Sequence, residues 1–143
     1  MQEASRAKGI QLRILKAGTK SEIGTVFSLV QQPVDALVVQ ADPFFVNRSQ
    51  QFATLTARHA VPAIYEGRPF VLAGGLMSYG TNTLAMYRQI GVYAGRVLKG
   101  EKPSDLPVMQ PTKFELVINL IAAKAIGLAI PESFLLRADE VIE

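Results

Sequence analysis

The chain has 143 residues, of which 49% are hydrophobic and 19% are charged. This size fits one domain, and the high apolar fraction excludes an intrinsically disordered chain. The net charge of +3 is small and its lysines and arginines are scattered, so the sequence indicates no nucleic-acid partner. Without cysteine there is no disulfide, no thiol catalysis and no cysteine-based zinc site.

Short apolar runs alternate with amphipathic segments along the first hundred residues. Strands are predicted at Gln11–Lys16, Asp35–Gln40, Pro62–Tyr65 and Leu76–Tyr79. Strand–helix alternation of this kind predicts βαβ units, and the apolar strands suit a sheet that is covered on both faces. The expected fold class is therefore α/β, a three-layer parallel sheet with helices on both faces.

Helix starts are marked by capping residues. Thr19 and Glu22 form a capping box before an apolar face made by Ile23, Val26, Phe27 and Val30. The same logic places a second helix near Asn47, with Gln50 three residues on. The longest helix is predicted at Asn82–Lys99, with a stripe able to face a core: Leu84, Tyr87, Ile90, Ala94 and Val97.

The last part of the chain has a different character. Residues 101–112 are rich in proline and polar residues and predict an extended connection. A strand at Lys113–Asn119, two short helices and a closing strand at Glu140–Ile142 follow. We expect residues 1–100 to form one lobe and residues 101–143 a crossover and tail that packs on something else. Glu3–Lys8 reads as the end of a helix that lacks its beginning, which suggests a fragment.

Motifs for catalysis are missing from the sequence. His59, the only histidine, has no nucleophile and orienting acid at a recognisable spacing, so a structural role is expected. Gly74-Gly75 matches no phosphate-binding fingerprint and predicts a helix end followed by a turn. We expect no enzyme, no cofactor and no metal. The first residues lack the apolar core of a signal peptide, and no run is long enough to span a membrane.

A ligand site is better predicted from topology. In open α/β sheets, ligands bind outside the carboxyl ends of the strands. Aromatic, charged and amide side chains gather in or beside the loops that follow the predicted strands, a mixture that suits a small polar or amphiphilic ligand. Two purely structural alternatives stay open: Asp42 could cap a turn before Pro43, and Phe44 and Phe45 could anchor their loop against the sheet. The candidate ligand-binding residues are Asp42, Phe44, Phe45, Tyr65, Glu66, Arg68 and Tyr79, with Asn47 and Asn82 beside them.

Several strings resemble one family. ADPFF (41–45), ARHAVPAIY (57–65), AGGLMSYG (73–80) and the run from 95 to 120 are similar to substrate-binding proteins of ABC transporters related to tryptophan and tyrosine uptake, as are AKAIGLAIPES (123–133) and ADEVIE (138–143). The resemblance implies one lobe, the C-terminal one, of a type I periplasmic binding protein. In that family Asp42 and Glu66 match positions in the cleft loops.

The resemblance also implies partners and a location. It implies an amino acid or aromatic ligand held between this lobe and a missing N-terminal lobe, delivery to a membrane permease, and a periplasmic or other extracytoplasmic location. Loss of the first lobe would favour a homodimer. Three alternatives stay open: the ligand-sensing domain of a transcriptional regulator, an enzyme on a flavodoxin-like sheet, and an oligomerising protein without a transport role.

Overall fold

The computed structural model describes residues 2–29 and 34–143 and divides the chain into two compact units, Met1–Pro33 and Val34–Glu143. The smaller unit contains two helices, α1 (Gln2–Ala7) and α2 (Lys20–Leu29). All strands assigned within the described residues belong to the larger unit, as do all candidate site residues. The division predicted at residue 100, between one lobe and a crossover with a tail, stays a prediction.

Helix α2 begins with the capping box that the sequence predicts. The Thr19 hydroxyl accepts a hydrogen bond from the Glu22 amide at 3.2 Å, and the Glu22 carboxylate accepts one from the Thr19 amide at 3.2 Å. Ile23 and Phe27 on the predicted apolar face are buried, while Val30 lies outside the described residues.

The strand predicted at Gln11–Lys16 is wrong. Among the described residues this segment joins no sheet ladder. Its apolar alternation is compatible with a strand, but a strand also needs a neighbour that satisfies its backbone hydrogen bonds. Ile10 and Ile14 are 60% and 59% exposed, so this alternation does not mark a buried face.

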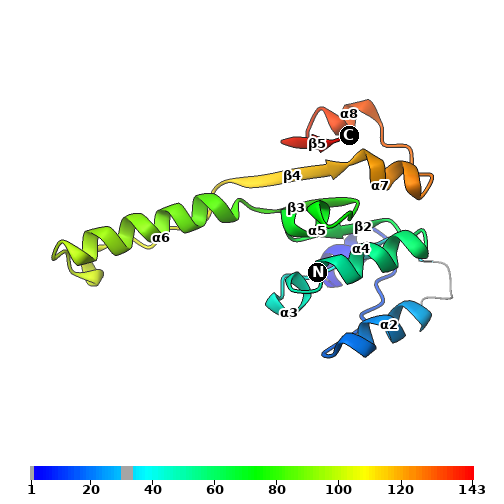
Figure 1. Cartoon of the computed structure of the whole chain (residues 1–143), viewed down its shortest axis with the longest axis horizontal. Helices are drawn as coiled ribbons and strands as arrows, with labels where there is room; N and C mark the ends of the chain where they lie inside the picture. Colours follow the sequence, from blue (N-terminus) through cyan, green and yellow to red (C-terminus); the bar gives the residue numbers. More distant parts are fainter. Residues whose placement is uncertain (1, 30–33) are drawn as a thin grey trace. The chain divides into compact units, whose positions relative to one another are not determined.

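The larger unit contains a five-stranded sheet with helices between its strands (Figure 1). Its strands are β1 (Leu37–Val38), β2 (Ala63–Tyr65), β3 (Met77–Thr81), β4 (Phe114–Asn119) and β5 (Glu140–Ile142). Its α-helices are α3 (Pro43–Val46), α4 (Ser49–Arg58), α5 (Arg68–Leu72), α6 (Thr83–Leu98), α7 (Leu120–Ala125) and α8 (Glu132–Leu135). A 3₁₀ turn, η1, spans Pro103–Asp105.

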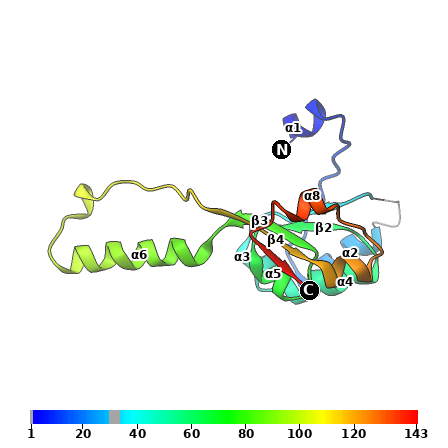
Figure 2. The ribbon, with the colours of Figure 1, turned by 90° about the horizontal axis from the view of Figure 1, so that it is seen from above.

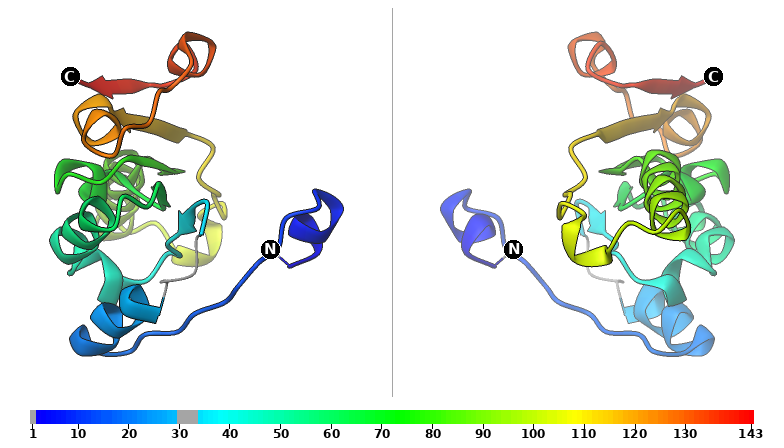
Figure 3. Two further views of the ribbon diagram at one scale, coloured as in Figure 1. Left: turned by 90° about the vertical axis from the view of Figure 1, so that its right-hand side faces the viewer. Right: turned by 90° about the vertical axis from the view of Figure 1, so that its left-hand side faces the viewer.

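The α/β class is confirmed, but the sheet is mixed rather than wholly parallel. The strands lie in the order β1-β2-β3-β4-β5, and β5 forms one edge of the sheet (Figure 3). Neighbours β1, β2 and β3 are parallel, β4 is antiparallel to β3, and β5 is parallel to β4. The start of β4 therefore lies beside the end of β3, with Thr81 paired to Phe114.

Helices α4 and α5 cover one face of the sheet, and α8 lies on the other side of the strands (Figure 2). Tyr65, Ser78 and Val117 pair across β2, β3 and β4, and each is only 1% exposed. Tyr65 stacks on Phe70 of α5 with ring centroids 4.6 Å apart, and Phe70 meets Phe52 of α4 edge-on at 6.1 Å. This aromatic cluster holds the sheet to its helices.

Two helix ends test the capping predictions. Gly74 has a φ of 97° after α5, and the Gly75 amide donates to the Phe70 carbonyl at 2.8 Å, so the predicted helix end is confirmed. The second helix, predicted to begin near Asn47, is confirmed as α4, which begins at Ser49. Its N-cap is Arg48, which makes no side-chain capping hydrogen bond, so the predicted capping residue is wrong. Gln50 does not close a capping box; its amide donates to the Ala73 carbonyl at 3.3 Å.

Helix α6 and residues 99–113 form an arm that projects from the sheet (Figures 1 and 2). The helix starts as predicted, with the Asn82 side chain accepting a hydrogen bond from the Ala85 amide at 2.7 Å. The returning segment is tied to the helix where the Tyr93 hydroxyl donates to the Pro107 carbonyl at 2.7 Å. None of the described helices has the length and apolarity needed to cross a bilayer.

The apolar stripe of α6 is not in a core, contrary to the prediction. Leu84, Tyr87 and Ile90 are 62%, 63% and 54% exposed, and α6 contains no buried residue. A sequence pattern shows that a helix has an apolar face, but it does not show that the same unit covers that face. The arm therefore presents an uncovered apolar surface.

Gly80 is the position where the sheet should tolerate a side chain least. A Cβ there would lie 1.6 Å from the Glu66 carbonyl oxygen. We expect Gly80→Ala to lower the free energy of unfolding by about 3 kcal/mol or more, because the end of β2 must move away from β3. Urea unfolding followed by circular dichroism measures the change.

Gly91 in α6 is the matched control, since a Cβ there meets nothing within 4 Å. Gly91→Ala should leave stability unchanged or raise it by about 0.5–1 kcal/mol, because alanine favours the helix. Equal effects of the two substitutions would contradict the close approach of Gly80 to β2.

Candidate functional site

The carboxyl ends of β1, β2 and β3 lie at one edge of the sheet and position most of the predicted ligand-binding residues. Asp42 follows β1, Glu66 follows β2, and Asn82 follows β3. Because β4 is antiparallel to β3, the same edge also receives the start of β4 and with it Glu115. His59 precedes β2 and so belongs to the opposite edge.

Asp42 caps helix α3. One carboxylate oxygen accepts a hydrogen bond from the Phe44 amide at 2.7 Å, so the turn-cap interpretation describes what Asp42 does in this structure. The residue is nevertheless exposed, and a carboxylate can accept several hydrogen bonds. The cap fixes the carboxylate at the sheet edge and leaves it accessible to solvent.

The two phenylalanines after Asp42 are half-buried anchors. The Arg48 guanidinium lies 3.7 Å from the Phe44 ring centroid, a cation–π contact, and donates a hydrogen bond to the Phe44 carbonyl at 2.9 Å. Phe45 meets Phe52 edge-on at 5.3 Å, which connects it to the core aromatics. Both rings keep part of their surface open at the edge of the sheet.

Tyr65 belongs to the core. It is 1% exposed, and its hydroxyl lies 3.1 Å from that of Thr56. Burial raises the pKa of Tyr65 above its usual value, an effect that the hydrogen bond with Thr56 partly offsets. Its side chain points under α5 because it shares a face with Ser78, whereas Glu66, the next residue, is half-buried at the sheet edge.

Arg68 is already paired. Its Nε and Nη2 atoms donate to the two carboxylate oxygens of Glu140 at 3.0 and 2.7 Å, a bidentate fork. This hydrogen-bonded pair raises the pKa of Arg68 and lowers the pKa of Glu140. The predicted use of Arg68 for a ligand carboxylate would therefore require this pair to open. Glu140 lies 72 positions along the chain, so sequence reasoning had no signal for it.

Tyr79 presents an aromatic surface on the face of the sheet opposite to Ser78. Its ring stacks on Phe114 with centroids 5.8 Å apart and planes 20° from parallel. Tyr79 is 57% exposed and Phe114 is 49% exposed. This pair forms an accessible apolar plate where β3 ends and β4 begins.

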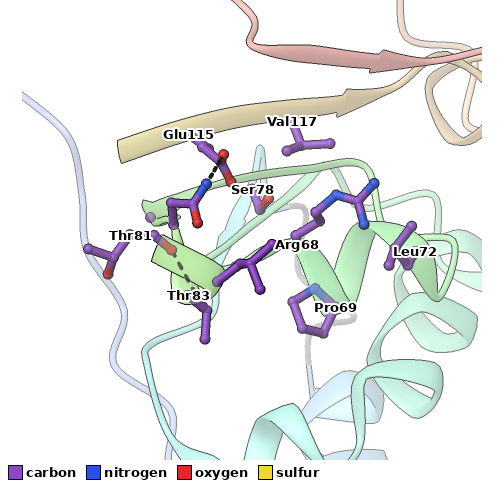
Figure 4. Close-up of a pocket in the computed structure, with 12 residues that line it drawn as sticks. Arg68, Pro69, Leu72, Ser78, Thr81, Thr83, Glu115 and Val117 are labelled. Atoms are coloured by element: carbon purple, nitrogen blue, oxygen red, sulfur yellow. Dashed lines mark hydrogen bonds between the residues drawn. The ribbon is translucent and has the colours of Figure 1, made fainter. Parts of the chain in front are cut away.

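A cavity of about 350 Å³ opens beside the sheet edge, between α5, the β3–β4 pair and the root of α6 (Figure 4). The Asn82 amide donates a hydrogen bond to the Glu115 carboxylate at its rim. The described residues contain no group of three or more side chains able to hold a metal ion. The cavity is lined by Gly67, Arg68, Pro69, Leu72, Ser78, Gly80, Thr81, Asn82, Thr83, Leu84, Glu115 and Val117.

Comparison with known proteins identifies the class. The sequence profile of the family described as ABC transporter substrate binding protein matches residues 1–142. The chain therefore belongs to this family, which is a family of substrate-binding proteins rather than a class of enzymes.

One curated relative and two solved structures illustrate the likeness. The tyrosine-binding protein of Clostridioides difficile (strain R20291) is 26% identical over 110 residues, which are 77% of this chain and 32% of that protein. The ABC domain from Streptococcus pneumonia in complex with L-Trp is 26% identical, with a TM-score of 0.87 over 98% of this chain and 48% of that one.

A conserved domain protein from Vibrio cholerae O1 biovar El Tor str. N16961 has the same TM-score of 0.87 at 22% identity, over 98% of this chain and 47% of that one. This likeness shows the fold. The chain spans about a third of the curated relative and about half of each solved structure.

Replacing Tyr65 tests its core role. Tyr65→Phe should lower the free energy of unfolding by about 1 kcal/mol, because it removes the hydrogen bond between the Tyr65 and Thr56 hydroxyls. The loss stays small because the Thr56 hydroxyl still donates to the Phe52 carbonyl. A raised folded-state pKa favours folding below the unfolded pKa near 10 and loses that contribution as the pH rises through the folded pKa. Wild type should therefore lose stability above about pH 10 more steeply than Tyr65→Phe.

Denaturant unfolding from about pH 8 to 11 measures this difference. Tyr79→Phe is the control, because it removes a hydroxyl from a residue that is 57% exposed and lies outside the core. Identical alkaline profiles for wild type and Tyr65→Phe would contradict the assignment.

Proposed function

We propose that this chain is one lobe of a two-lobed solute-binding protein that serves an ABC importer. The supporting observation is the sheet edge itself, where Asp42 and Glu66 lie on neighbouring strand ends within a chain of the substrate-binding family. Acidic groups of this kind bind ammonium groups through charge-assisted hydrogen bonds. The proposed role is binding without catalysis.

The ligand that we propose is an amino acid or another small aromatic compound. The named ligands of the two relatives at 26% identity, tyrosine and L-Trp, agree with this class. On this chain Phe44 and Phe45 expose part of their rings beside Asp42, and Tyr79 offers a further aromatic surface near the end of β3. An ammonium at the carboxylates and an aromatic body against these rings would combine orientation with burial of apolar surface.

The second lobe is proposed from the arm. The solved relatives overlay 98% of this chain and contain about as much chain again. We propose that this additional part covers the stripe of Leu84, Tyr87 and Ile90, so that α6 joins the two lobes. Ligand binding would then close the two lobes about a hinge. The closed protein, located outside the cytoplasm, would deliver the ligand to a membrane permease.

Asp42 is the residue whose replacement best tests the cleft. In the two-lobed protein, Asp42→Asn should weaken binding of L-Trp or L-Tyr by about 1.5–3 kcal/mol, roughly ten- to 150-fold, because it removes the charge. Asparagine keeps the cap on the Phe44 amide, so the loop should stay in place. Isothermal titration calorimetry measures the change.

The control is His59→Ala, a substitution at the opposite edge of the sheet. It should leave the affinity within about twofold of wild type, an energy difference well under 1.4 kcal/mol. If Asp42→Asn binds like wild type while His59→Ala does not, the cleft has been assigned to the wrong edge.

The uncovered arm predicts self-association of the 143-residue chain by itself. Exposed apolar patches of a few hundred Å² tend to find a partner, and a symmetric dimer is the simplest outcome. We expect light scattering at high concentration to give a mass above the 15.5 kDa of one chain. Tyr87→Glu with Ile90→Glu should restore the single-chain mass, whereas a monodisperse wild-type monomer would contradict the prediction.

A further inference from the structure

The cavity of about 350 Å³ beside the start of α6 contains polar groups that form few interactions with the rest of the fold. Ser78 is 1% exposed and lines the cavity, yet its hydroxyl forms no hydrogen bond within the described residues. A hydroxyl at the wall of a cavity can donate one hydrogen bond and accept others, and a ligand or water in the cavity would supply the partners. Figure 4 shows Ser78 at the cavity wall between Glu115 and Arg68.

Arg68 and Glu115 line the cavity, and together with Glu140, which pairs with Arg68, they carry one net negative charge. Arg68 and Glu140 neutralise each other through their bidentate pair. Glu115 accepts a hydrogen bond from the neutral amide of Asn82 through one of its two carboxylate oxygens, and it forms no ion pair within the described residues, although Arg68 attracts its charge from a distance. This favours a cation, and the geometry of a single carboxylate beside a hydroxyl suits a primary ammonium group.

Sheet register brings Ser78 and Glu115 to the same face. Ser78 pairs with Val117, and Glu115 precedes Val117 by two positions on β4. Diagonal neighbours of this kind have side chains that start roughly 7–8 Å apart, a gap that the long glutamate side chain can reduce. One ammonium group can therefore contact both the carboxylate and the hydroxyl.

The remaining walls are apolar. Pro69 and Leu72 of α5, Leu84 of α6 and Val117 of β4 line the cavity around the polar groups. About 350 Å³ suits a molecule of roughly ten non-hydrogen atoms, at the lower end of the size of ligand pockets. A ligand matched to this lining has one cationic end and one apolar body.

We propose that this cavity is a second binding site, separate from the cleft of Asp42 and Glu66, and that it takes a small primary amine with an apolar body. Its ammonium group would lie between Glu115 and Ser78, and its body against Leu72 and Leu84. A carboxylate on the ligand would weaken binding, because Glu115 repels it and the Arg68 fork is occupied by Glu140. The site uses both the sheet and the start of α6, so its occupant would restrain the arm.

The test uses the 143-residue chain and 2-phenylethylamine as the probe. Titration followed by ¹H–¹⁵N NMR should shift the amides of residues around Ser78, Thr83 and Glu115, while 3-phenylpropionate should shift none of them. L-Phenylalanine, which adds a carboxylate to the same amine, should bind at least several-fold more weakly. Equal binding of all three probes would overturn the proposal.

Three variants assign the groups. Glu115→Gln removes the charge but keeps an acceptor for Asn82, and should weaken amine binding on the order of tenfold or more. Ser78→Ala should weaken it several-fold, and Leu72→Trp should block the cavity without changing its charge. Glu101→Gln is the control, because it removes an exposed carboxylate that pairs with Arg96 on the arm.

The same titrations with Asp42→Asn and Glu66→Gln separate this site from the cleft. If these two variants lose 2-phenylethylamine and Glu115→Gln keeps it, the amine binds in the cleft and the second site is refuted, although the proposed transport function survives. If Glu115→Gln loses the amine and the cleft variants keep it, the second site is supported whatever the outcome of the L-Trp titrations.

Discussion

The antiparallel pairing of β3 with β4 determines most of what this unit can do. It is the sheet contact that joins the two ends of the arm, since the chain leaves the sheet after Thr81 and returns at Phe114, opposite the same residue. The pairing brings Glu115 to the carboxyl edge of the parallel strands and places Val117 under α5. It also orders β5 beside β4, which brings Glu140 within reach of Arg68.

The close packing at the end of β3 depends on this arrangement. Gly80 lies against the Glu66 carbonyl, and Ser78 lies under α5 beside Tyr65 and Val117, so three strands meet with little space between their backbones. Such packing holds the loops of the sheet edge in fixed positions. Binding residues on loops that are supported by a rigid sheet lose less entropy when a ligand binds.

Local signals predicted local structure well. The Thr19–Glu22 capping box, the Asn82 cap and the turn at Gly74-Gly75 depend on residues within a few positions of one another, and all three occur. The α/β class followed from the alternation of strands and helices. Tyr65 was assigned to the ligand site because it ends a strand, but the face of a strand that is covered depends on helices elsewhere in the chain.

The errors and omissions share one physical cause, which is that distant pairing is invisible in a single sequence. The segment Gln11–Lys16 has a strand pattern but no pairing partner in the described residues. The sequence of β4 predicts a strand, but it does not predict that this strand runs antiparallel to β3. The contacts of Arg68 with Glu140 and of Asn82 with Glu115 follow from that direction. Most of the candidate edge was therefore predictable, and the cavity beside it was not.

The arm has a consequence for how the sheet assembles. Pairing β3 with β4 closes a loop of about thirty residues. Bringing the two ends of this loop together costs chain entropy before the hydrogen bonds between the strands can stabilise the sheet. Helix formation in α6 shortens the part of that loop that remains flexible, so a local event assists a distant one. Each doubling of loop length costs only about 0.6 kcal/mol, so the tip of the arm can vary in length between relatives while the sheet stays the same.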